Sequence, residues 1–198
     1  MSFTEVDKFE KCISEYFNSP YGVAVDSCTH AIELCLRLNN SNNIKFPKQT
    51  YVGVPQLGFK LNLNWSFGEI KWRDFYFIEN TNIIDAAVLW KKNSYIKNTF
   101  MCISFQYQKH LNIGRGGMIL TDNESCHKLL KKMSYDGRLR DVSWRSQNID
   151  TLGYHYYMPP ESASKGIELF NKKKDLPPKK WTHEDYPDLS NMIIFSKK

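Results

Sequence analysis

The chain has 198 residues, 41% of them hydrophobic and 24% charged, which is typical of a globular protein with a single core. No run approaches the roughly 18 apolar residues of a membrane helix, and residues 1–8 lack the apolar stretch of a signal peptide. We therefore expect a cytoplasmic protein with no membrane partner. The net charge of +6 would suit nucleic acid, but the lysines gather late in the chain, as in a solvated tail, so nucleic-acid binding is only a rival interpretation.

The predicted elements follow one another as strand and helix along most of the chain. In chain order they are helix 9–17, strand 21–25, helix 30–38, strand 43–46, short helix 51–59, strand 60–65, weaker strands 75–78 and 81–85, strands 98–105 and 117–121, a helix from about 123, and a helix 160–170. This alternation predicts an α/β fold with a mostly parallel sheet flanked by helices on both sides. Because the pattern fades after residue 136, we divide the chain into an α/β domain over 1–150 and a short C-terminal remnant or tail over 151–198.

The cysteines indicate free thiols rather than disulfides or a metal site. They are odd in number and show no metal-type pairing, and three of them lie in apolar periodic stretches. Buried free thiols are typical of a reducing cytosol. The five are Cys12, Cys28, Cys35, Cys102 and Cys126.

Lys109 lies in the most informative stretch of the sequence. The apolar strand before it ends on a hydroxyl, Ser104, and a glycine-rich turn over 114–117 follows it. Another apolar run ends on a carboxylate, Asp85, with two alanines after it that suit close packing beneath a planar ring. An amine, an acid, a hydroxyl and a glycine-rich turn at strand ends are what a pyridoxal 5'-phosphate (PLP) site needs. On this interpretation Lys109 forms the Schiff base and Asp85 holds the pyridinium proton; the alternatives are an exposed loop lysine and a strand-end cap.

A second group of polar residues begins a helix. Ser27, Cys28 and Thr29 follow the strand 21–25, at the carboxyl end where α/β folds bind ligands. The first N–H groups of a helix have no helical partner, and the helix dipole favours an anion there. These residues are therefore candidates for holding a phosphate, although a plain Ser/Thr N-cap explains them equally well.

The motifs around these residues carry a family resemblance. The run 104–109 (SFQYQK) with 114–122 (GRGGMILTD) resembles the lysine motif and glycine turn of the DegT/DnrJ/EryC1/StrS sugar aminotransferases. Residues 23–32 resemble the phosphate loop of that family, 46–51 its Pro-x-x-Thr-aromatic segment, and 153–158 its Gly-Tyr-Asn-Tyr-Arg-Met segment. Five matches in the right order are specific, whereas any one alone would be weak.

The resemblance implies a PLP-dependent transferase fold of type I, the aspartate-aminotransferase fold, with its C-terminal small domain largely missing. It implies an internal aldimine on Lys109, with Asp85 on the pyridine nitrogen, and a homodimer whose sites are shared between subunits. The cofactor-binding residues that it and the residue chemistry together suggest are Ser27, Cys28, Thr29 and Ser104 at the phosphate, Tyr51 and Ala87 against the ring, Asp85, Lys109, and His155 reaching the phosphate of the neighbouring subunit.

Several positions depart from the family pattern. The substituted positions are Cys28 for a glycine, Val88 for Gln or His, Gln106 for a histidine, Arg115 for an acid, His155 for an asparagine and Tyr157 for an arginine. The chain also lacks a segment before the Asp-Ala-Ala strand. The leading hypothesis is an aminotransferase of carbohydrate biosynthesis that moves an amino group from an amino acid, glutamate being the expected donor, to a nucleotide-linked keto-sugar. The alternative is a PLP-binding pseudoenzyme or regulatory dimer without turnover.

Overall fold

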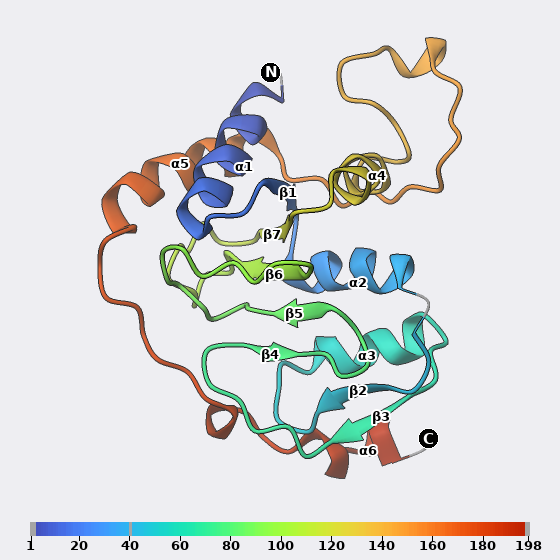
Figure 1. The fold of residues 1–198 in the computed structure, drawn as a ribbon, viewed down its shortest axis with the longest axis vertical. Coiled ribbons are helices and arrows are strands. Elements are labelled where there is room, and N and C mark those ends of the chain that lie inside the picture. Colours follow the sequence, from blue (N-terminus) through green and yellow to red (C-terminus); the bar gives the residue numbers. More distant parts are fainter. Residues whose placement is uncertain (1–2, 40, 197–198) are drawn as a thin grey trace.

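A five-stranded sheet runs through the centre of the protein in the order β1-β7-β6-β5-β4 (Figure 1). The structure is a computed structural model that describes residues 3–39 and 41–196. The strands are β1 Tyr21–Val25, β4 Tyr76–Phe77, β5 Ile83–Asp85, β6 Phe100–Ser104 and β7 Gly117–Thr121. Strands β1, β5 and β6 run in the same direction, so their carboxyl ends meet at one edge of the sheet, where β7 begins.

The α/β class is confirmed, but this sheet is mixed where we expected it to be mostly parallel. Only β5 and β6 pair in parallel within it, whereas β7 is antiparallel to both β1 and β6, and β4 is antiparallel to β5. The connections explain the difference. Residues 105–116 and 78–82 return the chain directly beside the strand it has just left, whereas a parallel neighbour needs a crossover, usually through a helix.

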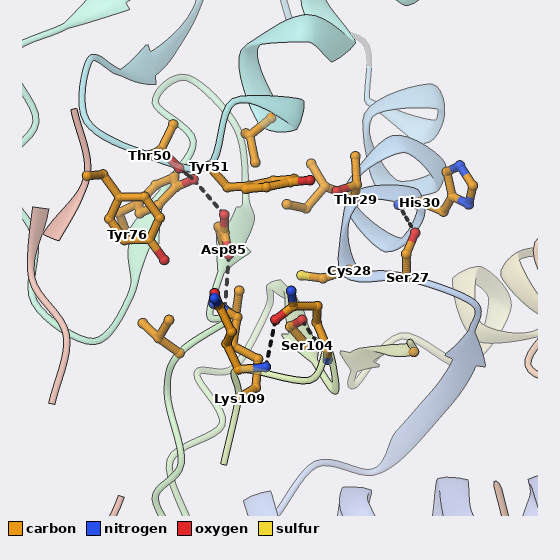
Figure 2. A pocket seen from close by; sticks show the side chains of 18 of the residues that line it. Ser27, Cys28, Thr29, His30, Thr50, Tyr51, Tyr76, Asp85, Ser104 and Lys109 are labelled. Atoms are coloured by element: carbon orange, nitrogen blue, oxygen red, sulfur yellow. Dashed lines mark hydrogen bonds between the residues drawn. The ribbon is translucent and has the colours of Figure 1, made fainter. Parts of the chain in front are cut away.

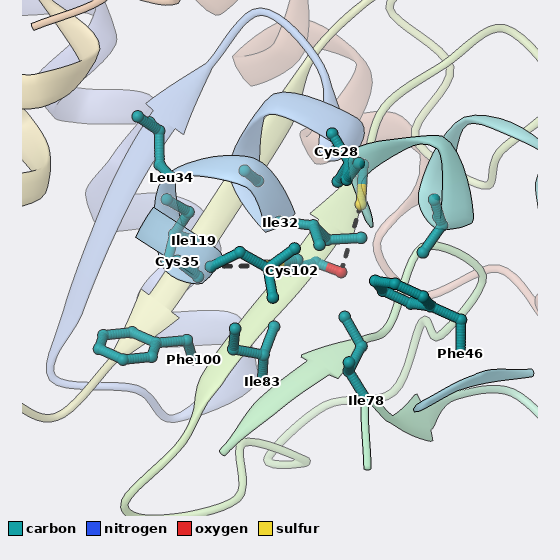
Figure 3. Packing of buried hydrophobic residues seen from close by; sticks show 14 of the residues in the cluster. Cys28, Ile32, Leu34, Cys35, Phe46, Ile78, Ile83, Phe100, Cys102 and Ile119 are labelled. Atoms are coloured by element: carbon teal, nitrogen blue, oxygen red, sulfur yellow. Dashed lines mark hydrogen bonds between the residues drawn. The ribbon is translucent and has the colours of Figure 1, made fainter. Parts of the chain in front are cut away.

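Helices cover the central sheet on both faces. The N-terminal α1 (Thr4–Phe17) and α5 (Pro160–Lys173) pack on one face, and α2 (Cys28–Leu38) and α4 (Glu124–Ser134) pack on the other. Figure 3 shows Ile32 and Cys35 of α2 against Cys102 of β6 and Ile83 of β5. Because both faces are buried, the central strands are continuous apolar runs without polar alternation.

A second, two-stranded sheet lies beyond β4. It pairs β2 (Ile44–Pro47) in parallel with β3 (Trp65–Gly68), and α3 (Gly53–Lys60) connects the two strands. The expected strand over 60–65 was therefore placed too early. A Cβ on Gly58 would lie 2.2 Å from the Trp65 indole nitrogen, so the indole packs directly on the helix, and residues 61–64 form the turn that brings it there.

The C-terminal part of the chain crosses the molecule. After α5, residues 174–196, which we call the C-terminal strap, run from the α1 side to the β2–β3 sheet (Figure 1). The strap contains only short helices, namely the 3₁₀ turns η2 (His183–Asp185) and η3 (Leu189–Asn191), and α6 (Ile193–Ser196); a further 3₁₀ turn, η1 (Trp144–Ser146), lies in the loop after α4. The proposed division near residue 150 stays a prediction. Within residues 3–39 and 41–196, no helix has the length and apolar character needed to cross a bilayer.

Candidate active site

A cavity of about 380 Å³ opens at the edge where β1, β5 and β6 end and β7 begins. Its volume lies within the range of small-molecule sites. Side chains from α2, the loop before α3, the ends of β5 and β6, the glycine-rich turn and the strap line it. Of the predicted site residues, the lining includes Ser27, Cys28, Thr29, Tyr51, Asp85, Ala87, Ser104 and Lys109.

Lys109 stands on a tight turn directly after β6. Its N–H donates to the carbonyl of Gln106 at 2.8 Å, and the Gln106 side chain accepts the N–H of Gln108 at 2.9 Å. The turn closes where Tyr107 donates to the carbonyl of Gly114, a glycine with a φ of +111° that few other residues adopt. Gln106, which replaces the family's histidine, therefore shapes the turn that carries the lysine.

The surroundings of Lys109 favour a neutral amine. Burial lowers the pKa of its ammonium, and the nearby Lys179 lowers it further, while Asp85 opposes both. A neutral amine is the nucleophilic form. Figure 2 shows the Lys109 side chain extending toward Asp85.

Asp85 ends β5 and is held by two donors. Its side chain is buried, it accepts the Tyr76 hydroxyl at 2.6 Å, and it accepts the N–H of Ala87 at 3.0 Å. The Tyr76 oxygen also lies 2.6 Å from the Thr50 hydroxyl. Burial raises the pKa of Asp85, while the hydrogen bonds from Tyr76 and Ala87 and the charge of Lys109 work against that rise. The carboxyl is thus fixed in orientation by its two donors.

Sequence reasoning missed Tyr76 and Thr50. Tyr76 is paired with Asp85 because β4 and β5 form a hairpin, in which Tyr76 stands opposite Asp85. The signal was present: an aromatic pair before Asn80 and an apolar pair after it are typical of a hairpin. Thr50 reaches the site from the loop before α3, a long-range contact that no local pattern indicates.

The start of α2 faces the cavity, and a glycine allows it to lie there. The Ser27 hydroxyl caps the helix by accepting the N–H of His30 at 3.2 Å. A Cβ on Gly117 would lie 2.5 Å from the Ser27 carbonyl carbon and 2.6 Å from the Cys28 nitrogen, so the first residue of β7 has to be glycine. The cavity edge therefore presents a helix N-terminus, with Thr29 and Ser104 as neighbouring hydroxyls.

Cys28 is accommodated by burial of its side chain. The thiol points away from solvent, 3.6 Å from the carbonyl of Cys102, and burial raises its pKa well above the usual thiol value. A neutral buried thiol leaves the backbone of the helix N-terminus at the cavity. The expectation of free thiols agrees with the described residues, in which all five cysteines are unpaired.

An aromatic ring covers one side of the cavity. Tyr51 is 59% exposed, and Figure 2 shows its ring edge-on above Asp85 with its hydroxyl toward Thr29. Gly53 leaves room for it, because a Cβ there would lie 2.8 Å from the ring. Ala87 contributes a small side chain to the same cavity. This arrangement leaves space for a flat ring.

The rim of the cavity is occupied by an ion-pair network. Arg115 donates to the Asp26 carboxylate at 2.7 Å, and His30 lies 2.6 Å from the other Asp26 oxygen. The His30 ring stacks on Tyr156 with centroids 3.7 Å apart. Arg115, which replaces an acid of the family pattern, is thus engaged with Asp26 at the glycine-rich turn.

His155 does not reach this cavity. Its ring is exposed and lies 3.0 Å from the Asp136 carboxylate, and its backbone pairs with Tyr135. A contact with a neighbouring subunit therefore stays a prediction. In its place, the strap and the segment before β4 contribute two aromatic residues to the cavity that sequence reasoning did not anticipate, Tyr186 and Trp72.

The residues present fit PLP. A buried acid and a lysine with a lowered pKa share one cavity, and a helix N-terminus with two hydroxyls borders it. These groups match the three features of that cofactor: its ring nitrogen, its aldehyde and its phosphate.

Comparisons with known proteins identify the family of this chain. A model of the DegT/DnrJ/EryC1/StrS aminotransferase family matches residues 1–76 and 92–181. The protein MJ1066 of Methanocaldococcus jannaschii aligns over 246 residues at 24% identity, covering 94% of this chain and 63% of that protein. Residues 77–91 lie outside the family match, and Asp85 is one of them. The location of Asp85 is therefore taken from the structure, where it is the last residue of strand β5.

Solved structures share the fold. AtS13 from Actinomadura melliaura superposes with a TM-score of 0.75 at 16% identity, covering 86% of this chain and 60% of AtS13. The Spr1654 protein of Streptococcus pneumoniae, in its PLP form, gives a TM-score of 0.71 at 17% identity, covering 85% and 59%. The chain thus spans less than two thirds of the length of these proteins. Its family model nevertheless matches most of its residues, and the chain belongs to the DegT/DnrJ/EryC1/StrS aminotransferase family.

Proposed function

We propose that the protein is a PLP-dependent aminotransferase. The observation that carries the proposal is the placement of Lys109 and Asp85 in one cavity that also borders the N-terminus of α2. When bound, PLP supplies an electron sink for breaking the Cα–H bond of an amino-acid substrate. The side chains of the protein itself perform the remaining steps of the catalysis.

Each of these residues has a role set by its surroundings. Lys109 supplies the amine that holds PLP, and the same amine moves the proton at the substrate Cα, because its lowered pKa keeps it available as a base. Asp85, oriented by Tyr76, holds the ring nitrogen in its protonated form. The start of α2 and the Ser104 hydroxyl bind the phosphate.

The substrates follow from the motif resemblance. We propose an amino-acid donor, glutamate, and a nucleotide-linked keto-sugar as acceptor. The net charge of +6 suits an anionic substrate of this kind. We also place the protein in the cytoplasm, in keeping with its free thiols.

We further propose a homodimer. Tyr51 and Arg115 at the mouth of the cavity are largely exposed, so a second subunit has an open site to complete. His155 is exposed on the loop after α4, and we propose that it donates to the phosphate in the neighbouring subunit.

A second candidate is a PLP-binding protein without turnover. The observation in its favour is Val88, an apolar residue that lines the cavity where the family carries a polar contact to the cofactor ring. This protein would bind the cofactor through Lys109 and fail to react with an amino donor.

Absorbance and covalent trapping separate these candidates. Purified protein with added PLP should show a visible band, and borohydride followed by mass spectrometry should locate the adduct on Lys109. Lys109→Ala should lose both signals, whereas Lys92→Ala, which removes an exposed lysine outside the cavity, should keep them. Loss of the band on adding glutamate supports turnover, a persistent band supports the second candidate, and an adduct on another lysine refutes the assignment of Lys109.

A further inference from the structure

A second, smaller cavity adjoins the first at Lys109. Its volume is about 170 Å³, less than half of the 380 Å³ of the main cavity. The two cavities share five lining residues, which are Ala87, Val88, Ser104, Gln108 and Lys109. The strap contributes Lys179 and Trp181 to the smaller cavity alone. Lys109 therefore stands between a space that fits the cofactor and a space bordered by the strap.

We propose that this smaller cavity binds the carboxylate of the amino donor and that Lys179 is the cation that recognises it. The inference rests on the proposed function, since it assigns a substrate group to the same site. Lys179 acts here as a specificity-determining residue.

Two lysine amines lie near one aromatic ring in this cavity. The Nζ of Lys179 lies 3.7 Å from the centroid of the Trp181 indole, and the Nζ of Lys109 lies 5.0 Å from it. Over residues 3–39 and 41–196, no carboxylate forms a salt bridge with Lys179. Burial lowers the pKa of Lys109, so Lys179 supplies the positive charge that attracts an anion to this cavity.

The strap holds Lys179 in place through its main chain. The indole of Trp90 donates to the carbonyl of Lys174 at 3.2 Å, and the N–H of Asp74 donates to the carbonyl of Trp181 at 3.0 Å. Between these anchors, Pro177 and Pro178 restrict the backbone immediately before the lysine. The cation is therefore positioned by a short segment that is tied to the body of the protein at both ends.

The other basic side chains near this cavity are engaged with partners of their own. Among the residues lining the same cavity, His110 stacks its ring on Trp90, and its Nε2 lies 2.8 Å from the carbonyl of Lys173, so this ring is already engaged. At the rim of the main cavity Arg115 is paired with Asp26. Lys179 is thus the cation near Lys109 whose charge is not neutralised by a described partner.

Geometry favours a carboxylate of an α-amino acid. The amino group of the donor has to arrive at Lys109, and its carboxylate is bonded to the same Cα, so the two groups reach adjoining spaces. The small cavity touches Lys109, as this arrangement requires. The N-terminus of α2, which suits a phosphate, borders the main cavity instead.

Binding of an unreactive dicarboxylate tests the proposal. Glutarate, which carries the carboxylates of glutamate and no amine, would be titrated by calorimetry into PLP-treated wild-type protein, Lys179→Gln and Lys180→Gln. Lys180 is the matched control, because it is the next residue, is exposed, and lines neither cavity. A charge-assisted contact of about 1.4 kcal/mol corresponds to a tenfold change in Kd. We expect Lys179→Gln to raise Kd about tenfold and Lys180→Gln to raise it less than twofold.

Three outcomes overturn the inference: unchanged glutarate affinity in Lys179→Gln, equal weakening by both variants, or no saturable binding of glutarate to the wild-type protein. Borohydride trapping on the same samples separates this failure from failure of the proposed function. An adduct on Lys109 that forms in Lys179→Gln, combined with unchanged glutarate affinity, removes the role of Lys179 and leaves the aminotransferase intact. Absence of the adduct from the wild-type protein removes the proposed function itself.

Discussion

Replacing Tyr76 by phenylalanine removes a single oxygen atom from between Asp85 and Thr50. That oxygen donates to the Asp85 carboxylate at 2.6 Å and lies 2.6 Å from the Thr50 hydroxyl. All three residues are at most 5% exposed, so the lost hydrogen bonds lie in a buried environment. The ring stays in place, and the substitution therefore measures the hydrogen bonds without opening a large cavity.

The size of the effect follows from the kind of bond. A hydrogen bond to a charged group contributes about 1.5–3 kcal/mol, and an unsatisfied buried hydroxyl such as that of Thr50 costs about 1–3 kcal/mol. The two contributions overlap because they share one oxygen. We expect Tyr76→Phe to lower the free energy of unfolding by about 2–4 kcal/mol near neutral pH.

The loss should depend on pH in a defined direction. Burial raises the pKa of Asp85 in the folded protein, and the Tyr76 hydrogen bond opposes that rise, so Tyr76→Phe should raise this pKa further. A folded-state pKa above the unfolded value gives stability that is present in acid and is lost as pH rises through the folded pKa. The destabilisation should therefore be larger at neutral pH than in acid, where Asp85 is protonated in both variants.

Urea unfolding at neutral and at acid pH provides the assay, and Tyr16→Phe provides the control. The Tyr16 hydroxyl donates to the carbonyl of Lys174 at 3.1 Å, a bond to a neutral acceptor on the α1 side of the sheet. Its loss should cost about 1 kcal/mol and leave PLP binding unchanged. Equal and pH-independent losses in the two variants would show that Tyr76 does not support an ionised Asp85.

Three further outcomes follow from the site. Asp85→Asn should slow turnover far more than it weakens PLP affinity, because the acid acts on charge that develops during the reaction; a wild-type rate would make Asp85 structural. Gly117→Ala should weaken PLP binding and lower stability by about 1–3 kcal/mol, since its Cβ meets the backbone of Ser27 and Cys28. Gly68→Ala meets the flexible end of Ile70 at 3.2 Å and makes an ordinary contact with Lys45 at 3.5 Å, so it should change stability by less than about 1 kcal/mol and keep the affinity. Equal effects of the two substitutions would refute the close approach of Gly117 to the start of α2 as the cause. Mixed subunits of Lys109→Ala and His155→Ala should recover activity if the site is shared across a dimer, because one of the two sites then carries neither defect; proven subunit exchange without recovery would exclude the shared site.

The sequence predicted the order of elements better than their directions. Continuous apolar runs such as residues 100–104 and 117–121 correctly indicate strands buried on both faces. The same runs occur in parallel and antiparallel neighbours whenever both faces are covered, so hydrophobicity alone does not give direction. Direction here depends on the connections over 78–82 and 105–116, which contain no helix to carry the chain across the sheet.

Some residues of the candidate site could be predicted from the sequence and others could not. Lys109, Asp85 and the start of α2 were predictable because each follows a strand that ends at the same edge. The structure brings them into one cavity, while their catalytic roles stay predictions. Tyr76 and Thr50 were not found, because their contacts with Asp85 depend on pairing and loop placement over long distances in sequence. Reactive side chains that follow a strand can thus be found from the sequence. The residues that orient them are found only once the packing of the fold is known.

The strap covers one side of this site with a segment that is hydrogen-bonded to the rest of the protein. It is bonded through its main chain to the body of the protein, with the N–H of His183 on the carbonyl of Trp72 at 3.1 Å and the N–H of Leu189 on the carbonyl of Lys48 at 2.8 Å. Because Tyr186 and Trp181 enter the cavities from this fixed segment, one wall of the site is already formed before a substrate arrives. The cavity is also bordered by Tyr51, which is 59% exposed. We therefore expect substrate entry and contact with a second subunit on the Tyr51 side, and recognition of a small carboxylate under the strap.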